Sequence, residues 1–185
     1  MEVIPEPINI LITEMCFRIL GLGQFLRQAG HIPVVDGKGR AAFDEAVKLL
    51  RVGRTVGIFP EGALSPLEGV CPPHTGVARL ALTTGAPIIP VGIGLQREHI
   101  TFREITAGGK TEIARWYFHG PYAVTAGEAM HFEGEVEDRE HVRAVSQRIM
   151  QRISLLARES AQRISASQAA ESGARRPAAL AHTGY

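Results

Sequence analysis

The chain has 185 residues, of which 45% are hydrophobic and 21% charged, and its formal net charge is +1. Length and composition predict one globular domain with a sizeable core that needs no disulfide or metal staple. The balanced charge offers no excess of Lys and Arg for phosphates, which argues against nucleic-acid binding. Two cysteines without a CxxC pair or a His/Cys cluster predict neither a disulfide framework nor a metal site.

The first half of the chain alternates short β-branched runs with amphipathic segments. Strands are predicted at 8–12, 32–35, 55–59 and 88–93, and helices at 14–29, 42–50 and 75–82. Thr75 is a candidate cap of the last of these helices. The alternation predicts an α/β fold with a mostly parallel central sheet, covered by helices on both faces.

The second half carries a weaker strand signal and a strong helical one. Residues 111–118 and 122–126 flank Gly120-Pro121, so we expect two strands around a turn. A long final helix with an apolar stripe follows the acidic residues at 135–138. After about Ser165 the stripe ends, which predicts a domain over 1–164 and a disordered tail over 165–185.

The sequence predicts neither a signal peptide nor a transmembrane helix. The start, MEVIPEPINI, carries Glu and Pro where a signal peptide has a basic region and an apolar run. The longest uncharged run, 80–96, is broken by glycine and proline and is shorter than the ~20 apolar residues of a membrane span. We therefore expect any contact with a membrane to be peripheral, on the cytoplasmic side.

The most informative segment is Phe59-Pro60-Glu61-Gly62, where a predicted strand ends in a loop. Ligands of open α/β sheets bind at such strand ends. Pro60 ends ladder pairing, the Glu61 carboxylate accepts hydrogen bonds from a hydroxyl group, and Gly62 lets a ligand approach the backbone. The same residue types also form ordinary turns, so a turn without a ligand is the alternative.

Three blocks along the chain resemble the phospholipid/glycerol acyltransferase family, over about residues 8–160. Residues 59–62 with Ser65 resemble its Phe-Pro-Glu-Gly block, residues 30–34 its Gly-x-Ile-x-Val block, and residues 76–81 with 86–91 its last block. The resemblance implies a glycerol-phosphate-acyltransferase-like fold with a long C-terminal helix. It also implies an acceptor site made of Phe59, Pro60, Glu61, Gly62 and Ser65.

The implied function is transfer of a fatty acyl group in phospholipid synthesis. The donor would be acyl-CoA or acyl carrier protein, without a further cofactor, and the acceptor a lysophospholipid or glycerol-phosphate hydroxyl. In the family a His-x4-Asp motif supplies the general base. We expect that motif upstream of Ile8, where the printed sequence has none, so we assign no catalytic residue and expect no activity of this chain alone. The alternative is a catalytically silent lipid-binding or partner module derived from the family.

His31 and Asp36 have the His-x4-Asp spacing, which we interpret as a coincidence. The residues between them are β-branched or proline and predict a strand. Positions five apart on a strand face opposite ways and lie about 17 Å apart. His31 is predicted to be a partly buried strand-end residue with satisfied polar atoms.

Departures from the family's blocks concern the acceptor's head group. Ala63 and Leu64 stand where the family has threonine and arginine, and Asp36 replaces a second arginine. Leucine cannot make the charge-assisted hydrogen bonds that hold a phosphate. The candidates for phosphate or head-group contacts are Lys38, Arg40 and His74. A phosphate acceptor and a lipid with a different head group therefore stay open as alternatives.

Overall fold

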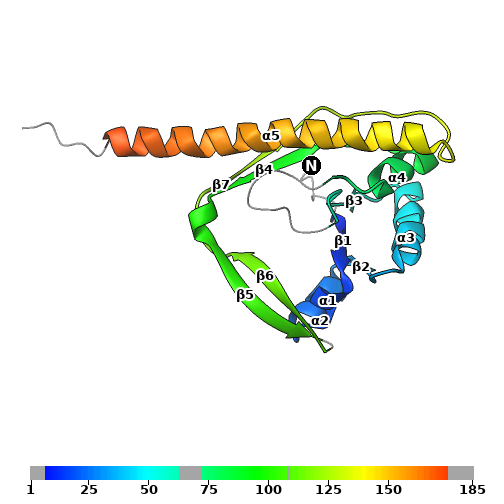
Figure 1. Cartoon of the computed structure of the whole chain (residues 1–185), viewed down its shortest axis with the longest axis horizontal. Helices are drawn as coiled ribbons and strands as arrows, with labels where there is room; N and C mark the ends of the chain where they lie inside the picture. The colour runs from blue at the N-terminus through cyan, green and yellow to red at the C-terminus, as the bar shows by residue number, and fades with distance from the viewer. Residues whose placement is uncertain (1–6, 63–71, 108, 175–185) are drawn as a thin grey trace, which may run out of the picture.

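The computed structural model describes residues 7–62, 72–107 and 109–174. Within these described residues, thirteen elements follow one another (Figure 1). They are β1 (Asn9–Thr13), α1 (Glu14–Phe17), α2 (Leu22–Gln28), β2 (Ile32–Val34), α3 (Gly39–Arg51), β3 (Val56–Gly57), α4 (Gly76–Thr84), β4 (Val91–Leu95), the 3-10 helix η1 (Arg97–His99), β5 (Ile100–Ala107), β6 (Lys110–Tyr117), β7 (Tyr122–Ala126) and α5 (Arg139–Ala174).

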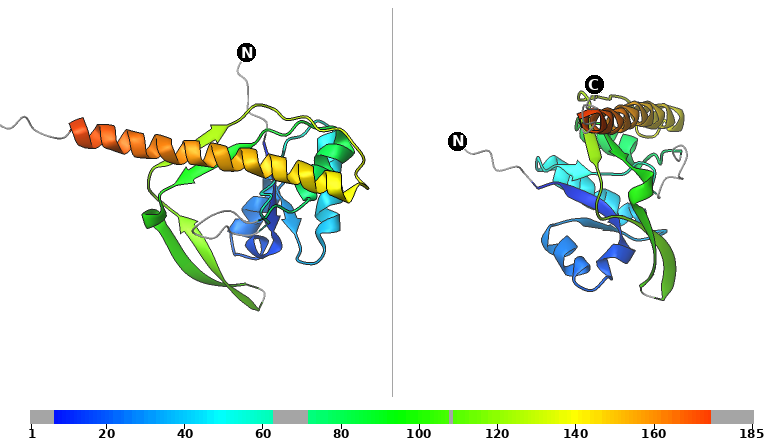
Figure 2. Two further views of the ribbon diagram at one scale, coloured as in Figure 1. Left: turned by 45° about the horizontal axis from the view of Figure 1, so that its top comes forward. Right: turned by 90° about the vertical axis from the view of Figure 1, so that its left-hand side faces the viewer.

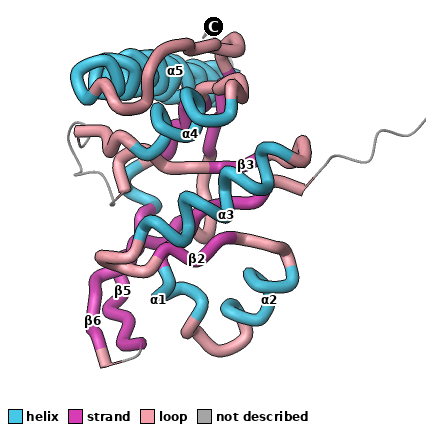
Figure 3. Tube along the Cα trace, turned by 90° about the vertical axis from the view of Figure 1, so that its right-hand side faces the viewer, coloured by secondary structure: helices cyan, strands magenta, loops and turns pink. Residues whose placement is uncertain are grey.

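The first three strands form a parallel sheet in the order β2-β1-β3, which confirms the predicted α/β class. Helix α3 packs beside this sheet and α4 lies between α3 and α5 (Figure 3). Apolar spacing along α3 places Ala42 and Ala46 in one core cluster with Ile32 of β2 and Leu80 of α4. Thr75 precedes α4, but its side chain makes no capping hydrogen bond.

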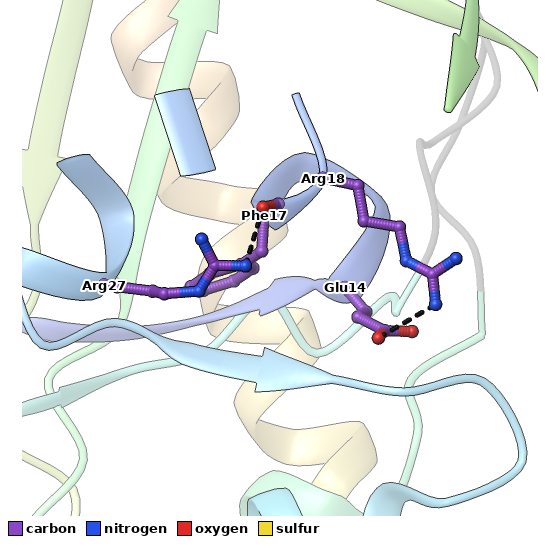
Figure 4. A network of polar contacts seen from close by, with 4 residues as sticks. All are labelled: Glu14, Phe17, Arg18 and Arg27. Carbon is purple, nitrogen blue, oxygen red and sulfur yellow. Dashed lines mark hydrogen bonds and ion pairs between the residues drawn. The ribbon is translucent and has the colours of Figure 1, made fainter. Parts of the chain in front are cut away.

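The predicted single helix over 14–29 is wrong, because the chain turns between α1 and α2. Gly21 has φ +80°, and a Cβ at Gly23 would overlap the Phe17 carbonyl. Glycine therefore permits both the turn and the close approach. Arg27 donates a hydrogen bond to the Phe17 carbonyl oxygen at 3.0 Å, and Arg18 pairs with Glu14 at 3.0 Å (Figure 4).

Strand β4 belongs to an antiparallel ribbon with β7, not to the parallel sheet. It begins at Val91, three residues later than the predicted 88–93 strand, and Ile88 makes only an isolated bridge with Met130. One face of the ribbon packs on α5 through Gly92 and Gly94. The opposite face is apolar and exposed, and carries Val91, Ile93, Leu95, Tyr122 and Val124.

The strands predicted at 111–118 and 122–126 exist as β6 and β7 but do not pair with each other. β6 forms an antiparallel hairpin with β5, a strand that the sequence reasoning missed because charged residues interrupt its apolar pattern. The hairpin reaches away from α5 toward the α1–α2 corner (Figure 2). Trp116 and Phe118 share one of its faces, with stacked rings 5.5 Å apart.

Helix α5 has 36 residues and packs on α4, β4 and β7. Its apolar positions Val142, Val145 and Ile149 form a second core cluster with Val77 and Ala78 of α4. The helix continues past Ser165 to Ala174, so the predicted disordered tail is wrong for 165–174, and 175–185 lie outside the described residues. Over the part of the chain that the structure describes, no helix combines the length and apolarity needed to cross a bilayer.

Candidate acceptor site at the end of β3

The candidate site begins where β3 ends. Pairing with β1 covers only Val56–Gly57, so the predicted strand over 55–59 is shorter than expected. Pro60 is buried, whereas the Phe59 side chain is 62% exposed. The Gly62 amide donates to the Phe59 carbonyl at 3.1 Å, and Gly62 has φ +63°, which favours glycine. The loop therefore turns sharply at the carboxyl end of the strand.

Glu61 carries the most unusual polar group of this loop. Its Oε2 atom is buried and, among the described residues, has no hydrogen-bond partner. Buried carboxylate oxygens in proteins are normally paired, because leaving one unpaired costs desolvation free energy. Glu61 Oε2 is therefore a hydrogen-bond acceptor that no described residue satisfies.

His74 is the sequence-predicted head-group residue that the fold brings to this loop. Its amide donates to the Pro60 carbonyl at 2.7 Å, which ties the segment before α4 to the end of β3. The imidazole lies against Gly62, where an added Cβ would come within 2.7 Å of Nε2. His74 is exposed, and its ring has no hydrogen bond to any described residue. Ser65, the last member of the predicted acceptor site, lies outside the described residues.

Lys38 and Arg40 lie elsewhere, at the start of α3. Both side chains are exposed, and Arg40 pairs with Asp44 at 3.0 Å. Such exposed pairs contribute little free energy. Within the described chain, neither cation contacts residues 59–62 through a hydrogen bond or ion pair, so their role as head-group contacts stays a prediction.

His31 behaves as predicted for a satisfied strand-end histidine. It is half-buried, and its Nδ1 accepts a hydrogen bond from the Ile10 amide at 3.2 Å. Asp36 is exposed, and His31 and Asp36 form no hydrogen bond with each other in the part of the chain that is described. Over residues 7–62, 72–107 and 109–174, no three His, Cys, Asp or Glu residues form a candidate metal site.

Asn9 is a structural residue of this region that the sequence reasoning missed. It is buried on β1, and its Nδ2 donates to the Gly30 carbonyl at 2.7 Å. This contact fixes the 30–34 block beside β1. The signal available in the sequence was a polar residue inside the otherwise apolar run 8–12.

Comparison with known proteins decides the family. The acyltransferase family model matches residues 1–94 of this chain. The chain belongs to the acyltransferase family. The match includes the 30–34 and 59–62 blocks and the whole of the last block, which confirms the family expected from those residues. No curated protein matches this acyltransferase-family chain.

A solved structure also shows the acyltransferase fold. The crystal structure of the 1-acyl-sn-glycerophosphate acyltransferase PlsC from Thermotoga maritima matches with a TM-score of 0.51 at 24% identity. The match covers 77% of this chain and 56% of the PlsC chain. The present chain thus spans a little over half of PlsC, and the likeness concerns the fold.

The contact between Gly62 and His74 makes a measurable prediction. Gly62→Ala combines a left-handed backbone cost of about 1–2 kcal/mol with an overlap on the imidazole. Gly37→Ala is the matched control, because Gly37 has φ +70° and open space around its Cβ position. In urea unfolding we expect Gly62→Ala to be the more destabilising by about 1 kcal/mol. Adding His74→Ala should remove that excess, and an unchanged excess would contradict the contact.

Proposed function

We propose that this chain takes part in acyl transfer to the hydroxyl of a lysophospholipid or glycerol phosphate, with residues 59–62 forming the acceptor site. The observation that carries the proposal is the Oε2 of Glu61 at the end of β3, which is buried and has no hydrogen-bond partner among the described residues. A hydroxyl of the acceptor donates to this oxygen and offsets its desolvation. Membership of the acyltransferase family supports the reaction class.

Three residues of the loop, together with His74, have a part in this proposal. Glu61 holds and orients a hydroxyl, and Gly62 permits the turn of the loop and the close approach of the His74 ring. The exposed imidazole of His74 faces the head group, as a donor to phosphate or another polar group. Phe59 offers exposed apolar surface to the acceptor's chain. Such lipids lie in a membrane surface, which we propose the chain approaches from the cytoplasmic side.

The reaction joins the acceptor oxygen to the carbonyl carbon of a thioester. The carbon–sulfur bond breaks, the donor leaves as a thiol, and the hydroxyl proton passes through a base to the leaving thiolate. The donor is acyl-CoA or acyl carrier protein. We assign no base among the described residues, since His31 uses Nδ1 for the Ile10 amide and has no carboxylate partner there.

The lack of an assigned base among the described residues favours a second candidate, a catalytically silent module. Such a module keeps the acceptor loop and binds lysolipid without turning it over. It requires the Glu61 site but no histidine–aspartate dyad. The two candidates therefore predict the same binding and differ only in product formation.

The deciding experiment incubates the purified chain with labelled acyl-CoA and each of three acceptors: glycerol 3-phosphate, lysophosphatidic acid and lysophosphatidylcholine. Lysolipid binding is measured in parallel by calorimetry. We expect binding of at least one acceptor. Labelled product identifies an acyltransferase, and binding without product identifies the silent module. Absence of both contradicts the proposed function. Turnover lost in His31→Ala would contradict the structural role given to that histidine.

A further inference from the structure

The β4–β7 ribbon and the β5–β6 hairpin are two parts of one long antiparallel pair of strands that is interrupted in the middle. The last pair of the ribbon is Leu95 with Tyr122, and the first pair of the hairpin is Ile100 with Tyr117. Residues 96–99 and 118–121 separate these pairs, and in the described chain they form no ladder with each other. We call these two segments the joint. The register is the same on both sides of it, so the joint interrupts the pairing without shifting it.

The β5–β6 hairpin is attached to the described chain mainly through the joint. Strands β4 and β7 pack on α5, whereas β5 and β6 pack on each other. Among the described elements, no helix and no other strand makes more than a slight contact with β5 or β6. Figures 1 and 2 show the hairpin as an arm that leaves the ribbon at η1. The direction of this arm is therefore set by the contacts inside the joint.

Two imidazoles occupy the joint, one from each segment. His99 is half-buried at the end of η1, and His119 is exposed on the segment that leads to β7. Their ring centroids are 5.1 Å apart with the ring planes at 80°, and the Tyr117 ring lies edge-on to His99 at 6.2 Å. Gly120 has φ +122°, and an added Cβ there would come within 2.8 Å of the His99 ring. The joint is therefore packed around the His99 ring.

The charged groups of the joint do not neutralise these rings. Among the described residues, neither imidazole makes a hydrogen bond or an ion pair. Helix η1 contributes Arg97 and Glu98, both exposed, and Glu98 lies opposite His119 in the register. Strand β6 contributes the Tyr117 hydroxyl, which donates to a backbone carbonyl, and α5 contributes the amide of Gln168, which is hydrogen-bonded to the start of the joint. The one carboxylate of the joint, Glu98, thus pairs with neither ring.

We propose that His99 and His119 make the joint a pH-sensitive hinge for the β5–β6 hairpin, independently of the proposed acyl transfer. Imidazoles take up a proton between about pH 8 and about pH 5. One proton leaves a charged ring beside a neutral one. A second proton places two like charges at the 5.1 Å separation of the rings, where they repel each other. The rings then separate, and the hairpin is released from the direction that their contact sets.

The single tryptophan of the chain reports on the joint. Trp116 lies on β6, and its ring stacks at 5.5 Å on Phe118, the first residue of the second joint segment. The emission of Trp116 and its quenching by acrylamide are measured on the whole chain from about pH 8 to about pH 5. We expect a red shift and stronger quenching as the pH falls, because the released hairpin exposes the stacked rings. Far-UV circular dichroism over the same range should stay unchanged, since the strands keep their pairing.

His119→Phe is the decisive variant, because it keeps an aromatic ring at an exposed position but cannot take up a proton. It should abolish the pH-dependent change in emission. His99→Phe should abolish it as well, since the repulsion needs two charges. A direct effect of one proton on Trp116 would instead survive in one of the two variants. His131→Phe is the matched control: His131 is exposed and lies outside the joint, and its replacement should leave the change intact.

Four results would overturn the hinge. They are a constant emission over the whole pH range, a change that persists in His119→Phe, a change that His131→Phe removes as well, and a loss of the circular dichroism signal together with the emission change. The last result would show that the whole chain unfolds. If His99→Phe does not fold, His119→Phe decides alone, because an exposed side chain tolerates replacement.

Discussion

Gly92→Ala is expected to lower the free energy of unfolding by about 3 kcal/mol or more. An added Cβ would overlap the backbone of Leu156 and Ala157, which no side-chain rotation can relieve. Helix α5 would have to move off the ribbon. That movement would also break the hydrogen bond from the Ser160 hydroxyl to the Gly92 carbonyl, 2.9 Å long and buried. Ser160 is fully buried, so its hydroxyl would lose this acceptor in a low-dielectric site and keep at most its 2.7 Å hydrogen bond with the Thr125 hydroxyl.

Urea unfolding followed by circular dichroism measures this loss, with Gly39→Ala as the matched control. Gly39 begins α3, has no positive φ, and has open space at its Cβ position. Alanine there should leave stability unchanged or raise it slightly, since it favours the helix. Equal stabilities of Gly92→Ala and Gly39→Ala would show that α5 does not pack on this face of the ribbon.

Glu61→Ala should weaken acceptor binding by about 10- to 100-fold, which corresponds to the roughly 1.5–3 kcal/mol of a hydrogen bond to a charged group. The change removes the buried Oε2 that we assign to the acceptor hydroxyl. Because that oxygen has no partner among the described residues, its removal should not lower stability. Weaker binding with unchanged or higher stability is the signature of a binding group rather than a structural one.

Calorimetry with the acceptor that binds best measures the binding affinity, and urea unfolding measures the free energy of unfolding. Glu61→Gln keeps a neutral acceptor oxygen and should bind with intermediate affinity. Glu159→Ala, an exposed carboxylate on α5, is the control and should change neither quantity. If Glu61→Ala binds the acceptor as tightly as the unchanged chain does, the role that the proposed function gives to Glu61 is contradicted.

Local signals in the sequence were enough for most elements but not for their ends or partners. Helix α3 and the parallel strands β1 and β2 follow from apolar spacing and β-branched runs. The break between α1 and α2 was missed, although Gly21 and Gly23 both lie within the segment 14–29 whose apolar spacing suggested one helix. A stripe of apolar positions shows which residues are buried, but it does not show whether the backbone continues between them.

Strand pairing was the part that the sequence left open. The runs at β6 and β7 read as one hairpin because they adjoin a Gly-Pro turn, yet β6 pairs with β5 and β7 with β4. Adjacent runs compete with more distant ones for the same edges. The pairing of β7 with β4 accompanies the close approach of α5 to Gly92 and Gly94. That approach is a contact between segments more than 60 residues apart.

By itself the sequence determined the α/β class, the acyltransferase family and the Glu61 loop, because these follow from periodicity and from contiguous residue blocks. Only the tertiary structure decided that His74 rests on Gly62, that His31 satisfies the Ile10 amide, and that β7 pairs with β4. Those facts join residues that are distant in the chain. Burial and hydrogen-bond pairing depend on every segment that packs around a group, so they exist only once the whole fold is assembled.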